Sequence, residues 1–380
     1  MAQSSRASDP GSPQGRLIRE RQSTWLDYIH RTMLRSGELK ALIEGRGVRG
    51  VTSNPTIFEQ AIGKSDAYDG AILALAGSGK DTEAIYESLA IEDIRSACDL
   101  FLPIYEMTAA NDGYVSMEVS PRLAHDSEGS LRDARRLWTA IGRPNAMIKI
   151  PGTAEGLPAI ATALSEGINI NVTLLFAVEM YQQVIDAYLT GLERRQAAGG
   201  SIERVRSVAS FFISRVDTEV DKRLEALGKP AVTGPLMGTA AVANAKLAYV
   251  QYTEHFEGQR FRALMGNGAA VQRPLWASTG TKNPAYPDTK YVDELIGPDT
   301  VNTIPPATLE AFADHGTVDR TVDRDVDQAG RQIAAIEALG ISMKEVTDFL
   351  VQDGVKKFAD SFAALLAAVD QKRVKLAGIS

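Results

Sequence analysis

The sequence is poor in the side chains that bind metals or form disulfides. Its 380 residues include one cysteine and four histidines. A single cysteine, Cys98, excludes an internal disulfide and a zinc or iron–sulfur site built from several cysteines. The histidines are scattered and lack HxxxH-type spacing, so we expect no metal and no cofactor.

The sequence also lacks long apolar runs and an excess of basic residues. No apolar stretch approaches the roughly 20 residues that cross a bilayer, and the first two dozen residues contain no segment of signal-peptide type. We therefore expect a cytoplasmic protein with no membrane partner. With 41 basic and 48 acidic residues the net charge is -7, which argues against a nucleic-acid partner and still permits a local basic pocket for phosphate.

Short apolar or β-branched runs alternate with helix-period segments along the chain. The runs cover residues 25–29, 50–52, 114–119, 146–150, 168–172, 205–213, 273–277 and 301–304. Eight such alternations favour an α/β fold with a closed parallel sheet, the (β/α)₈ or TIM barrel. A doubly wound open sheet is the main alternative, but neither GxGxxG nor GxxxxGK[ST] occurs in the sequence.

The spacing of the runs predicts additions to the barrel. The intervals 51–117 and 210–276 are long enough for extra helices after the second and the sixth strand, and further helical pattern follows the eighth run. A last apolar stripe, from Val355 to Val369 through Phe358 and Phe362, is placed to cross the barrel or to cover its mouth. We expect a flexible tail (residues 1–24) followed by a single barrel domain (25–380).

Catalytic side chains of a barrel project from the carboxyl ends of its strands. Polar residues that interrupt or end the apolar runs are therefore candidates for the site. They are Asp27, Asn54, Glu118, Lys149, Asn171, Thr173, Ser210 and Ser278.

Lys149 is the most informative of these residues because apolar residues flank it on both sides. On a strand it faces either the barrel interior or the helix layer, and both are dry. Burial disfavours an ammonium ion and produces a neutral amine that attacks carbonyl groups. The alternative is a lysine at a strand end whose side chain reaches solvent.

Glu118 and Asp27 also lie within apolar runs. Schiff-base chemistry needs groups that move protons, and two carboxyl groups near one amine supply them. The alternative is a structural ion pair with the lysine. Thr173 is placed to hold a water for proton transfer, or else to N-cap a helix that starts at Leu174.

Two segments are candidates for phosphate binding. Arg215 follows the sixth run directly and is suited to bidentate capture of a phosphate, unless it forms a surface pair with Asp217 or Glu219. The turn from Ser278 to Lys282 follows the seventh run, where barrels often bind phosphate.

These residues lie within segments that resemble the transaldolases of the longer bacterial type. The segments are VTSNPTIF (51–58), SMEVSP (116–121), MIKIPGT (147–153), NINVTLLF (169–176), SVASFFISRVD (207–217), and PLWASTG (274–280) through NTIP (302–305). The resemblance covers roughly residues 25–370 and keeps the family's order of motifs.

The resemblance implies a metal-free enzyme of the non-oxidative pentose phosphate pathway. It would transfer a dihydroxyacetone unit through a lysine Schiff base from a ketose phosphate (sedoheptulose 7-phosphate or fructose 6-phosphate) to an aldose phosphate (glyceraldehyde 3-phosphate or erythrose 4-phosphate). The partners implied are sugar phosphates, for a monomer or a homo-oligomer.

The resemblance also implies a role for each residue. Lys149 would form the imine, Glu118 and Thr173 would hold the water of proton transfer, and Asp27 would assist cleavage of the C3–C4 bond. Hydroxyl groups of the dihydroxyacetone part would contact Asn54, Asn171 and Ser210, and the phosphate would contact Arg215 and Ser278. Shorter transaldolases have an arginine two positions after the serine, where this sequence has Gly280, so Lys282 is expected to supply that charge.

Two alternatives to transaldolase activity stay open at this point. The same imine would serve a simple sugar-phosphate aldolase that releases free dihydroxyacetone. A catalytically silent barrel that acts as a binding or scaffold protein belongs to a different class, and turnover of a ketose phosphate distinguishes the two classes.

Overall fold

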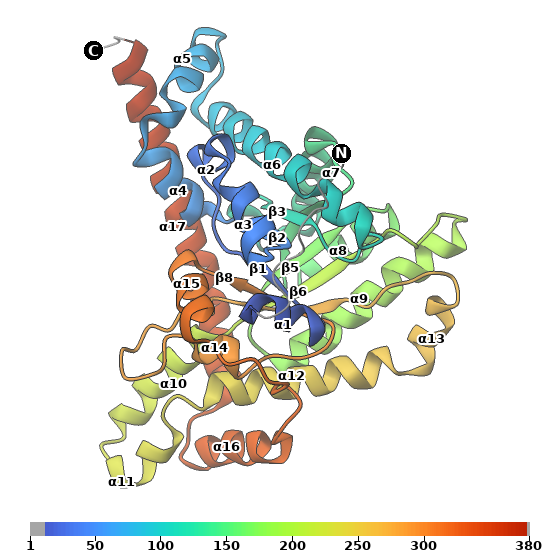
Figure 1. The fold of residues 1–380 in the computed structure, drawn as a ribbon, viewed down its shortest axis with the longest axis vertical. Helices are drawn as coiled ribbons and strands as arrows, with labels where there is room; N and C mark the ends of the chain where they lie inside the picture. The colour runs from blue at the N-terminus through green and yellow to red at the C-terminus, as the bar shows by residue number, and fades with distance from the viewer. Residues whose placement is uncertain (1–11, 378–380) are drawn as a thin grey trace.

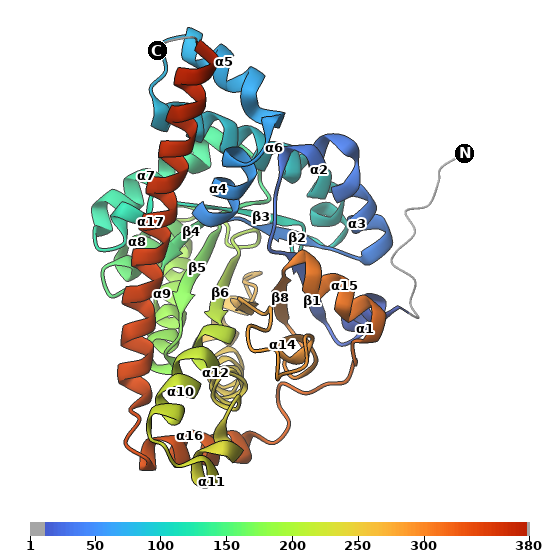
Figure 2. The same ribbon diagram turned by 90° about the vertical axis from the view of Figure 1, so that its left-hand side faces the viewer.

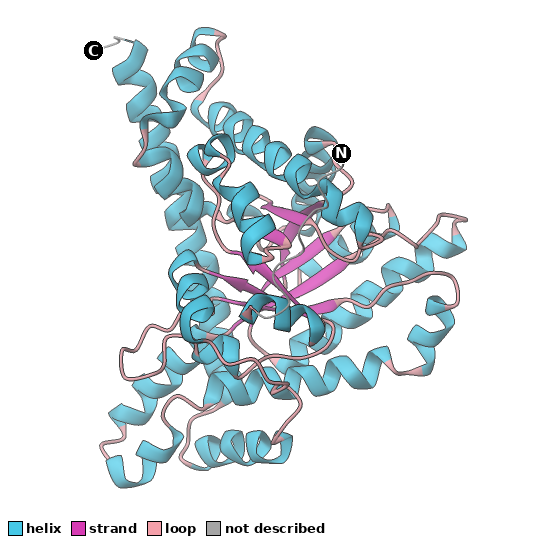
Figure 3. Cartoon of the chain, in the orientation of Figure 1, coloured by secondary structure: helices cyan, strands magenta, loops and turns pink. Residues whose placement is uncertain are grey.

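A computed structural model describes residues 12–377 of the chain. Eight parallel strands form a closed barrel in chain order (Figure 3). They are β1 (Gln22–Leu26), β2 (Gly50–Thr52), β3 (Tyr114–Glu118), β4 (Ala146–Pro151), β5 (Ile170–Leu175), β6 (Ser207–Phe212), β7 (Arg273–Ala277) and β8 (Thr300–Ile304). The predicted (β/α)₈ barrel is confirmed.

Helices surround the barrel on all sides (Figure 1). Before β3 they are α1 (Pro13–Arg19), α2 (Arg31–Ser36), α3 (Glu38–Arg46), α4 (Pro55–Gly63), α5 (Asp69–Gly77) and α6 (Thr82–Met107). Between β3 and β7 they are α7 (Ser127–Ile141), α8 (Gly156–Ser165), α9 (Val178–Ala197), α10 (Ser214–Ala226), α11 (Pro230–Thr233), α12 (Ala240–Phe256) and α13 (Gln259–Met265). The last four are α14 (Lys290–Asp293), α15 (Pro306–His315), α16 (Val326–Ala338) and α17 (Met343–Ala377). The extra helices predicted after the second and the sixth strand and after the barrel are therefore present.

Amphipathic patterning explains how these helices pack. In α7, for example, Ala134, Leu137 and Ile141 are buried at helical spacing, while the arginines between them face outward. The strands are buried along nearly their whole length, as expected for a parallel sheet covered on both faces. No helix within residues 12–377 has both the length and the apolar character needed to cross a membrane.

The N-terminal prediction is wrong for residues 13–24. Helix α1 occupies Pro13–Arg19, and Ser12 caps it by accepting a hydrogen bond from the Gly15 amide. Strand β1 then begins at Gln22, three positions before the predicted run. The polar residues at its start are buried and hydrogen-bonded: the Gln22 amide donates to the Leu295 carbonyl oxygen over 2.7 Å. The rest of the predicted tail, residues 1–11, lies outside the described residues.

Strand β5 is longer than predicted, and it contains an irregularity. Its register with β6 shifts between Val172 and Leu175, and Leu174 has a positive φ of 59°. A shift of this kind re-aims neighbouring side chains. Thr173 therefore lies inside a strand, and the alternative in which it caps a helix starting at Leu174 is wrong because the next helix begins at Val178.

Strand register places three candidate residues in one row. Glu118 is the partner of Lys149 in the β3–β4 pair, and Lys149 is the partner of Asn171 in the β4–β5 pair. Residues paired in register on neighbouring parallel strands point to the same face of the sheet. Because Glu118 and Lys149 are in contact, the row faces one shared space, the upper interior of the barrel.

Helix α17 crosses the barrel mouth. Figure 2 shows it running along one side of the molecule, from α5 at one end to α16 at the other. The Ser342 hydroxyl accepts a hydrogen bond from the Glu345 amide at the helix start. The apolar stripe predicted on this helix is buried at Phe358, Phe362, Leu365 and Val369. The prediction that it lies against the mouth is confirmed, since Phe358 lines the cavity described below.

Replacement of Gly191 by alanine tests the close packing of α9 on α8. An added Cβ would lie 2.7 Å from the Leu164 Cβ and 2.8 Å from the Ala161 carbonyl oxygen, and neither atom moves easily. Gly191→Ala should therefore lower the free energy of unfolding in urea by about 1–3 kcal/mol. Gly330→Ala in α16 is the control, since that added Cβ meets nothing within 4 Å, and it should raise stability by up to about 1 kcal/mol. A neutral or stabilising Gly191→Ala would contradict the packing.

Candidate active site

A cavity of about 270 Å³ opens at the carboxyl ends of the barrel strands. Eight of the residues predicted from the sequence line it: Asp27, Asn54, Lys149, Thr173, Ser210, Arg215, Ser278 and Lys282. The other two predicted residues lie against this group, because Glu118 contacts Lys149 and Asn171 accepts a hydrogen bond from Ser210. The structure thus brings the whole predicted set together.

Lys149 is buried at the floor of the cavity, with 4% of its surface exposed. Its Nζ lies 3.3 Å from Glu118 Oε2 and donates to the Ser53 carbonyl oxygen over 3.0 Å. The same nitrogen is 5.9 Å from the centre of the Phe358 ring. The alternative in which this lysine reaches bulk solvent is wrong.

Glu118 shares the buried environment of the lysine, with 5% of its side chain exposed. Burial raises the pKa of Glu118, and the neighbouring Lys149 opposes that shift without cancelling it. The contact with Lys149 lacks hydrogen-bond geometry, so Glu118 Oε2 has no hydrogen-bond partner among the described residues. Thr173 Oγ1 is a second buried oxygen there without a partner.

Asp27 stands across the cavity, immediately after β1. Its Oδ1 accepts a hydrogen bond of 2.7 Å from the Thr52 hydroxyl, which also lies 2.6 Å from the Thr303 hydroxyl. Burial raises the pKa of Asp27, opposed by the Thr52 hydrogen bond and by the charges of Lys149, Lys282 and Arg215. The two carboxyl groups of the site therefore hold their protons more tightly than ordinary surface carboxyl groups do.

Amides and hydroxyls fill the wall between these charged groups. The Ser210 hydroxyl donates to Asn171 Oδ1 over 2.7 Å, and Asn171 Nδ2 donates to the Ser116 hydroxyl over 3.1 Å. Asn54 caps α4, because its Oδ1 accepts from the Ile57 amide over 3.0 Å. These contacts fix the orientation of each side chain before a ligand binds.

Arg215 marks the opposite end of the cavity. Its guanidinium lies 5.0 Å from the centre of the Phe212 ring and 5.9 Å from that of Phe358. Burial lowers its pKa, and Nη1 has no hydrogen-bond partner among the described residues. The alternative pairing is wrong: Asp217 accepts hydrogen bonds from Tyr291 and Ala241, and Glu219 pairs with Arg223.

Ser278 and Lys282 complete this end from the segment after β7. Ser278 has a φ of 56°, and its hydroxyl lies 3.0 Å from that of Ser214. Lys282 is exposed and lines the cavity. A Cβ built on Gly280 would lie 3.8 Å from Lys282 Nζ. The lysine ammonium is therefore close to the position from which a side chain at 280 would project.

The sequence analysis missed several residues of the site, among them Thr52 and Phe358. Thr52 ends the second apolar run, and the rule that selected the other polar residues at strand ends would have found it. Phe358 belongs to the predicted α17 stripe, but nothing in the sequence places it over Lys149.

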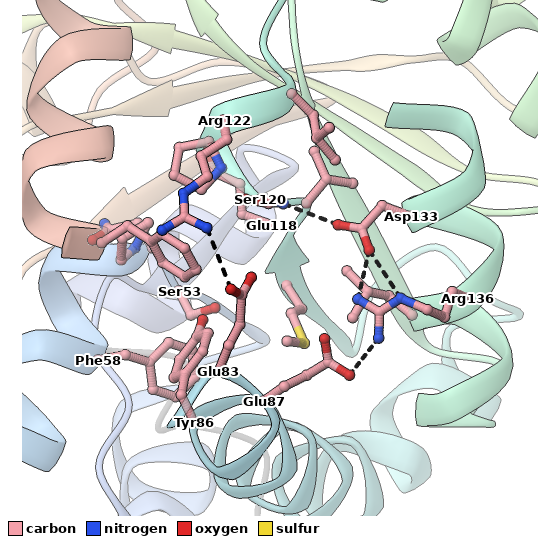
Figure 4. A pocket seen from close by; sticks show the side chains of 18 residues that line it. Ser53, Phe58, Glu83, Tyr86, Glu87, Glu118, Ser120, Arg122, Asp133 and Arg136 are labelled. Atoms are coloured by element: carbon pink, nitrogen blue, oxygen red, sulfur yellow. Dashed lines mark hydrogen bonds and ion pairs between the residues drawn. The ribbon is translucent and has the colours of Figure 1, made fainter. Parts of the chain in front are cut away.

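A second pocket of about 300 Å³ lies on the other side of Glu118 (Figure 4). Ion pairs cross it: Arg122 contacts Glu83, and Arg136 contacts both Asp133 and Glu87. Because its arginines are already paired with carboxylates, this pocket offers no unpaired cation to an anionic ligand. In the described part of the chain, no group of three or more His, Cys, Asp and Glu side chains is arranged to hold a metal ion.

The fold and the site together define a (β/α)₈-barrel enzyme with a buried amine, two carboxyl groups and a guanidinium at the carboxyl ends of its strands. A family model described as transaldolase/fructose-6-phosphate aldolase matches residues 24–369. The chain therefore belongs to the transaldolase/fructose-6-phosphate aldolase family. This family membership confirms the transaldolase function predicted from the sequence.

Several similar proteins carry the name transaldolase. A transaldolase of Thermobifida fusca is 51% identical, with 95% of this chain and 98% of that protein covered. A transaldolase of Trichodesmium erythraeum is 47% identical (93% and 96% covered). Transaldolase 1 of Streptomyces coelicolor is 49% identical (93% of each chain covered).

Replacement of Asp27 by asparagine tests the electrostatics of the cavity. Because burial raises the pKa of Asp27, ionising this carboxyl group costs free energy in the folded protein and not in the unfolded chain. Asp27→Asn should therefore increase the free energy of unfolding near neutral pH. The increase should fade as the pH falls from the raised pKa of the folded state to below the ordinary carboxyl pKa, where both states are protonated. Urea unfolding across this pH range measures it.

Asp288→Asn is the matched control for this measurement. Asp288 is exposed, and its hydrogen bond to His315 lowers its pKa, so its replacement should leave stability unchanged or reduce it slightly. Loss of stability in Asp27→Asn at neutral pH would overturn the assigned direction.

Proposed function

We propose that the protein transfers a dihydroxyacetone unit between sugar phosphates through an imine on Lys149. The donor is fructose 6-phosphate or sedoheptulose 7-phosphate, and the acceptor is erythrose 4-phosphate or glyceraldehyde 3-phosphate. The observation that carries the proposal is the buried contact between Lys149 Nζ and Glu118 Oε2, at 3.3 Å. The family membership of the chain supports the same reaction.

The amine must lose a proton before it attacks the ketone. Transfer of a proton from Lys149 to Glu118 converts a buried ion pair into two neutral groups. The burial that raises the pKa of Glu118 favours this neutral pair. Glu118 then holds the proton that the next step needs.

Attack of the amine on C2 of the ketose gives a carbinolamine, and loss of its hydroxyl as water gives the imine. Glu118 returns its proton to that leaving hydroxyl. Thr173 Oγ1 and Glu118 Oε2, both buried and without a hydrogen-bond partner among the described residues, would bind the departing water between them. The same water would later hydrolyse the imine to release the product.

Asp27 acts in the cleavage of the C3–C4 bond. Its carboxylate takes the proton of the C4 hydroxyl while the bond electrons move onto the imine and form an enamine. An aldose phosphate leaves, and addition of the enamine to the acceptor aldehyde reverses these steps. The raised pKa of Asp27 makes its carboxylate a stronger base than an ordinary one.

The other side chains would orient the substrate. Asn171 and Ser210 lie beside Lys149 in the barrel interior and would contact the dihydroxyacetone hydroxyls, together with Asn54 at the rim. Arg215, Ser278 and Lys282 would bind the phosphate. Binding energy gained at the phosphate helps to orient the carbon chain at the amine.

The enamine must wait for an aldehyde without being protonated, so water has to be restricted. The Phe358 ring of α17 lies over Lys149 and beside Arg215 and would provide this cover. We place the reaction in the cytoplasm, since charged sugar phosphates do not enter a bilayer readily.

Reductive trapping tests the proposed nucleophile. Fructose 6-phosphate with borohydride should modify Lys149 irreversibly, and peptide mapping by mass spectrometry should find the label there. Lys149→Met should abolish labelling and reduce kcat by at least about 10³-fold, because no other amine replaces the nucleophile. Lys246→Met is the control, since Lys246 on α12 donates to the Arg324 carbonyl oxygen and does not line the cavity. Label on another lysine, or turnover by Lys149→Met, would refute the proposal.

Lys282→Ala tests the phosphate end of the site. Loss of one charge-assisted contact should raise the KM for fructose 6-phosphate about tenfold or more, with a smaller effect on kcat. Trapping by unphosphorylated dihydroxyacetone and borohydride should proceed at the wild-type rate. Lys40→Ala, on the exposed surface of α3, should change neither quantity. An unchanged KM in Lys282→Ala would exclude this lysine from phosphate binding.

A further inference from the structure

Two buried carboxyl groups on α10 take no part in the proposed chemistry. Asp217 and Asp221 lie one helical turn apart, and they are 1% and 7% exposed. Burying a carboxyl group costs free energy unless hydrogen bonds compensate for it. Both oxygens of each group are hydrogen-bonded, so the structure compensates for this cost. The partners in these hydrogen bonds indicate what the two carboxyl groups do.

Each carboxyl group connects three parts of the chain. Asp217 Oδ1 accepts from the Ala241 amide over 2.7 Å, and its Oδ2 accepts from the Tyr291 hydroxyl over 2.8 Å. Asp221 accepts from the Gly238 amide over 2.8 Å and from the Tyr286 hydroxyl over 2.7 Å. Helix α10, the segment that leads into α12, and the segment between β7 and β8 are thereby tied together.

The side chain of Lys290 also contacts this group of residues. Lys290 Nζ donates to the Gly238 carbonyl oxygen over 2.7 Å and lies 5.1 Å from the centre of the Tyr286 ring. The ring packs tightly on Gly238, where an added Cβ would come within 2.6 Å of the Tyr286 Cζ. We call Asp217, Asp221, Tyr286 and Tyr291 the tyrosine–aspartate clamp.

The clamp joins the two walls of the phosphate end. Arg215 lies at the start of α10, half a turn before Asp217, whereas Ser278 and Lys282 lie in the segment that carries Tyr286. Lys282 lines the active-site cavity and also a shallow depression bordered by all four clamp residues. The clamp therefore connects the helix that carries Arg215 with the segment that carries Lys282.

The segment after β7 needs this restraint because it has little regular structure. Residues 278–289 form neither helix nor strand, and the short α14 follows them. Ser278 itself is held to α10, since the Ser214 amide donates to its carbonyl oxygen over 3.1 Å, but Lys282 lies four residues further on. An unrestrained loop loses conformational entropy when it binds a ligand, and that loss weakens binding.

We propose that the tyrosine–aspartate clamp positions Lys282 relative to Arg215, and so determines the affinity of the site for the phosphate group of its substrates. These are positioning residues: they touch the phosphate-binding loop and not the reacting carbon atoms. The inference rests on the proposed function, because it assumes that a sugar phosphate occupies the cavity.

Tyr286→Phe tests the clamp by removing one hydroxyl group. We expect the KM for fructose 6-phosphate, and the inhibition constant for inorganic phosphate, to rise about tenfold, with kcat within about twofold of the wild type, as for loss of preorganisation at a binding site. The rate of trapping by dihydroxyacetone and borohydride should not change, because that ligand has no phosphate. Asp221→Asn should show the same pattern, and the double variant should be no worse than the single ones.

Tyr249→Phe is the matched control. It removes a tyrosine hydroxyl that donates to the Pro298 carbonyl oxygen over 3.0 Å, on α12 and away from the cavity. It should cost similar stability and leave both phosphate-dependent constants unchanged.

The outcomes separate the two proposals. If Tyr286→Phe loses stability like Tyr249→Phe but keeps the wild-type constants for fructose 6-phosphate and inorganic phosphate, the clamp is structural only and the inference is refuted. A parallel fall in trapping by dihydroxyacetone also refutes it, because the damage would then extend beyond the phosphate end. If fructose 6-phosphate fails to label the wild-type protein, the proposed function itself fails.

Discussion

A buried contact between an amine and a carboxyl group, Lys149 with Glu118, is the interaction on which the rest of the structure depends. Neither charge is stable alone in the dry interior of the barrel, and an isolated buried ion pair of this kind contributes little to the free energy of folding. The barrel stabilises the pair by placing both residues in register on neighbouring strands, with Lys149 Nζ 3.3 Å from Glu118 Oε2. On helix α17, the centre of the Phe358 ring lies 5.9 Å from Lys149 Nζ.

The two ends of the cavity are built in different ways. The end around Lys149 consists of side chains on β3, β4 and β5, where the hydrogen-bonded ladder fixes their positions. The end around Arg215 is made of a helix start and an irregular segment, which have no such ladder. Hydrogen bonds that tyrosine hydroxyls donate to buried carboxyl groups replace it there. Under the proposed function, strands would therefore fix the geometry of the reacting groups, and the clamp would fix that of the phosphate-binding groups.

Much of the fold was predictable from the sequence because apolar runs mark the strands. The set of residues that form the site was predictable because the strand ends of a parallel barrel converge. Strand β1 was displaced in the prediction because its first residues are polar. Those residues are buried and hydrogen-bonded inside the lower barrel, and a polarity pattern cannot recognise that situation. The end of β5 was missed because Leu174 continues the strand with a left-handed backbone.

Tertiary contacts account for what the sequence could not indicate. Periodicity shows that Phe358 belongs to a buried stripe, but only the packing of α17 decides that it covers Lys149. The clamp was likewise not predictable from the sequence, because the sequence pattern indicates that Asp217 and Asp221 are ordinary solvent-facing charges on a helix. The roles of the individual site residues stay predictions, although the structure brings all of them together.

The order of the parts along the chain has a consequence for biosynthesis. The strand that carries Lys149 is translated well before the helix that carries Phe358, because β4 precedes α17 by more than half of the chain. A nascent polypeptide on the ribosome therefore contains the proposed nucleophile before the helix proposed to shield it has been synthesised. Under the proposed function, protection of the intermediate from solvent would be acquired only when the last helix docks. A prematurely terminated product would then carry Lys149 and lack that protection.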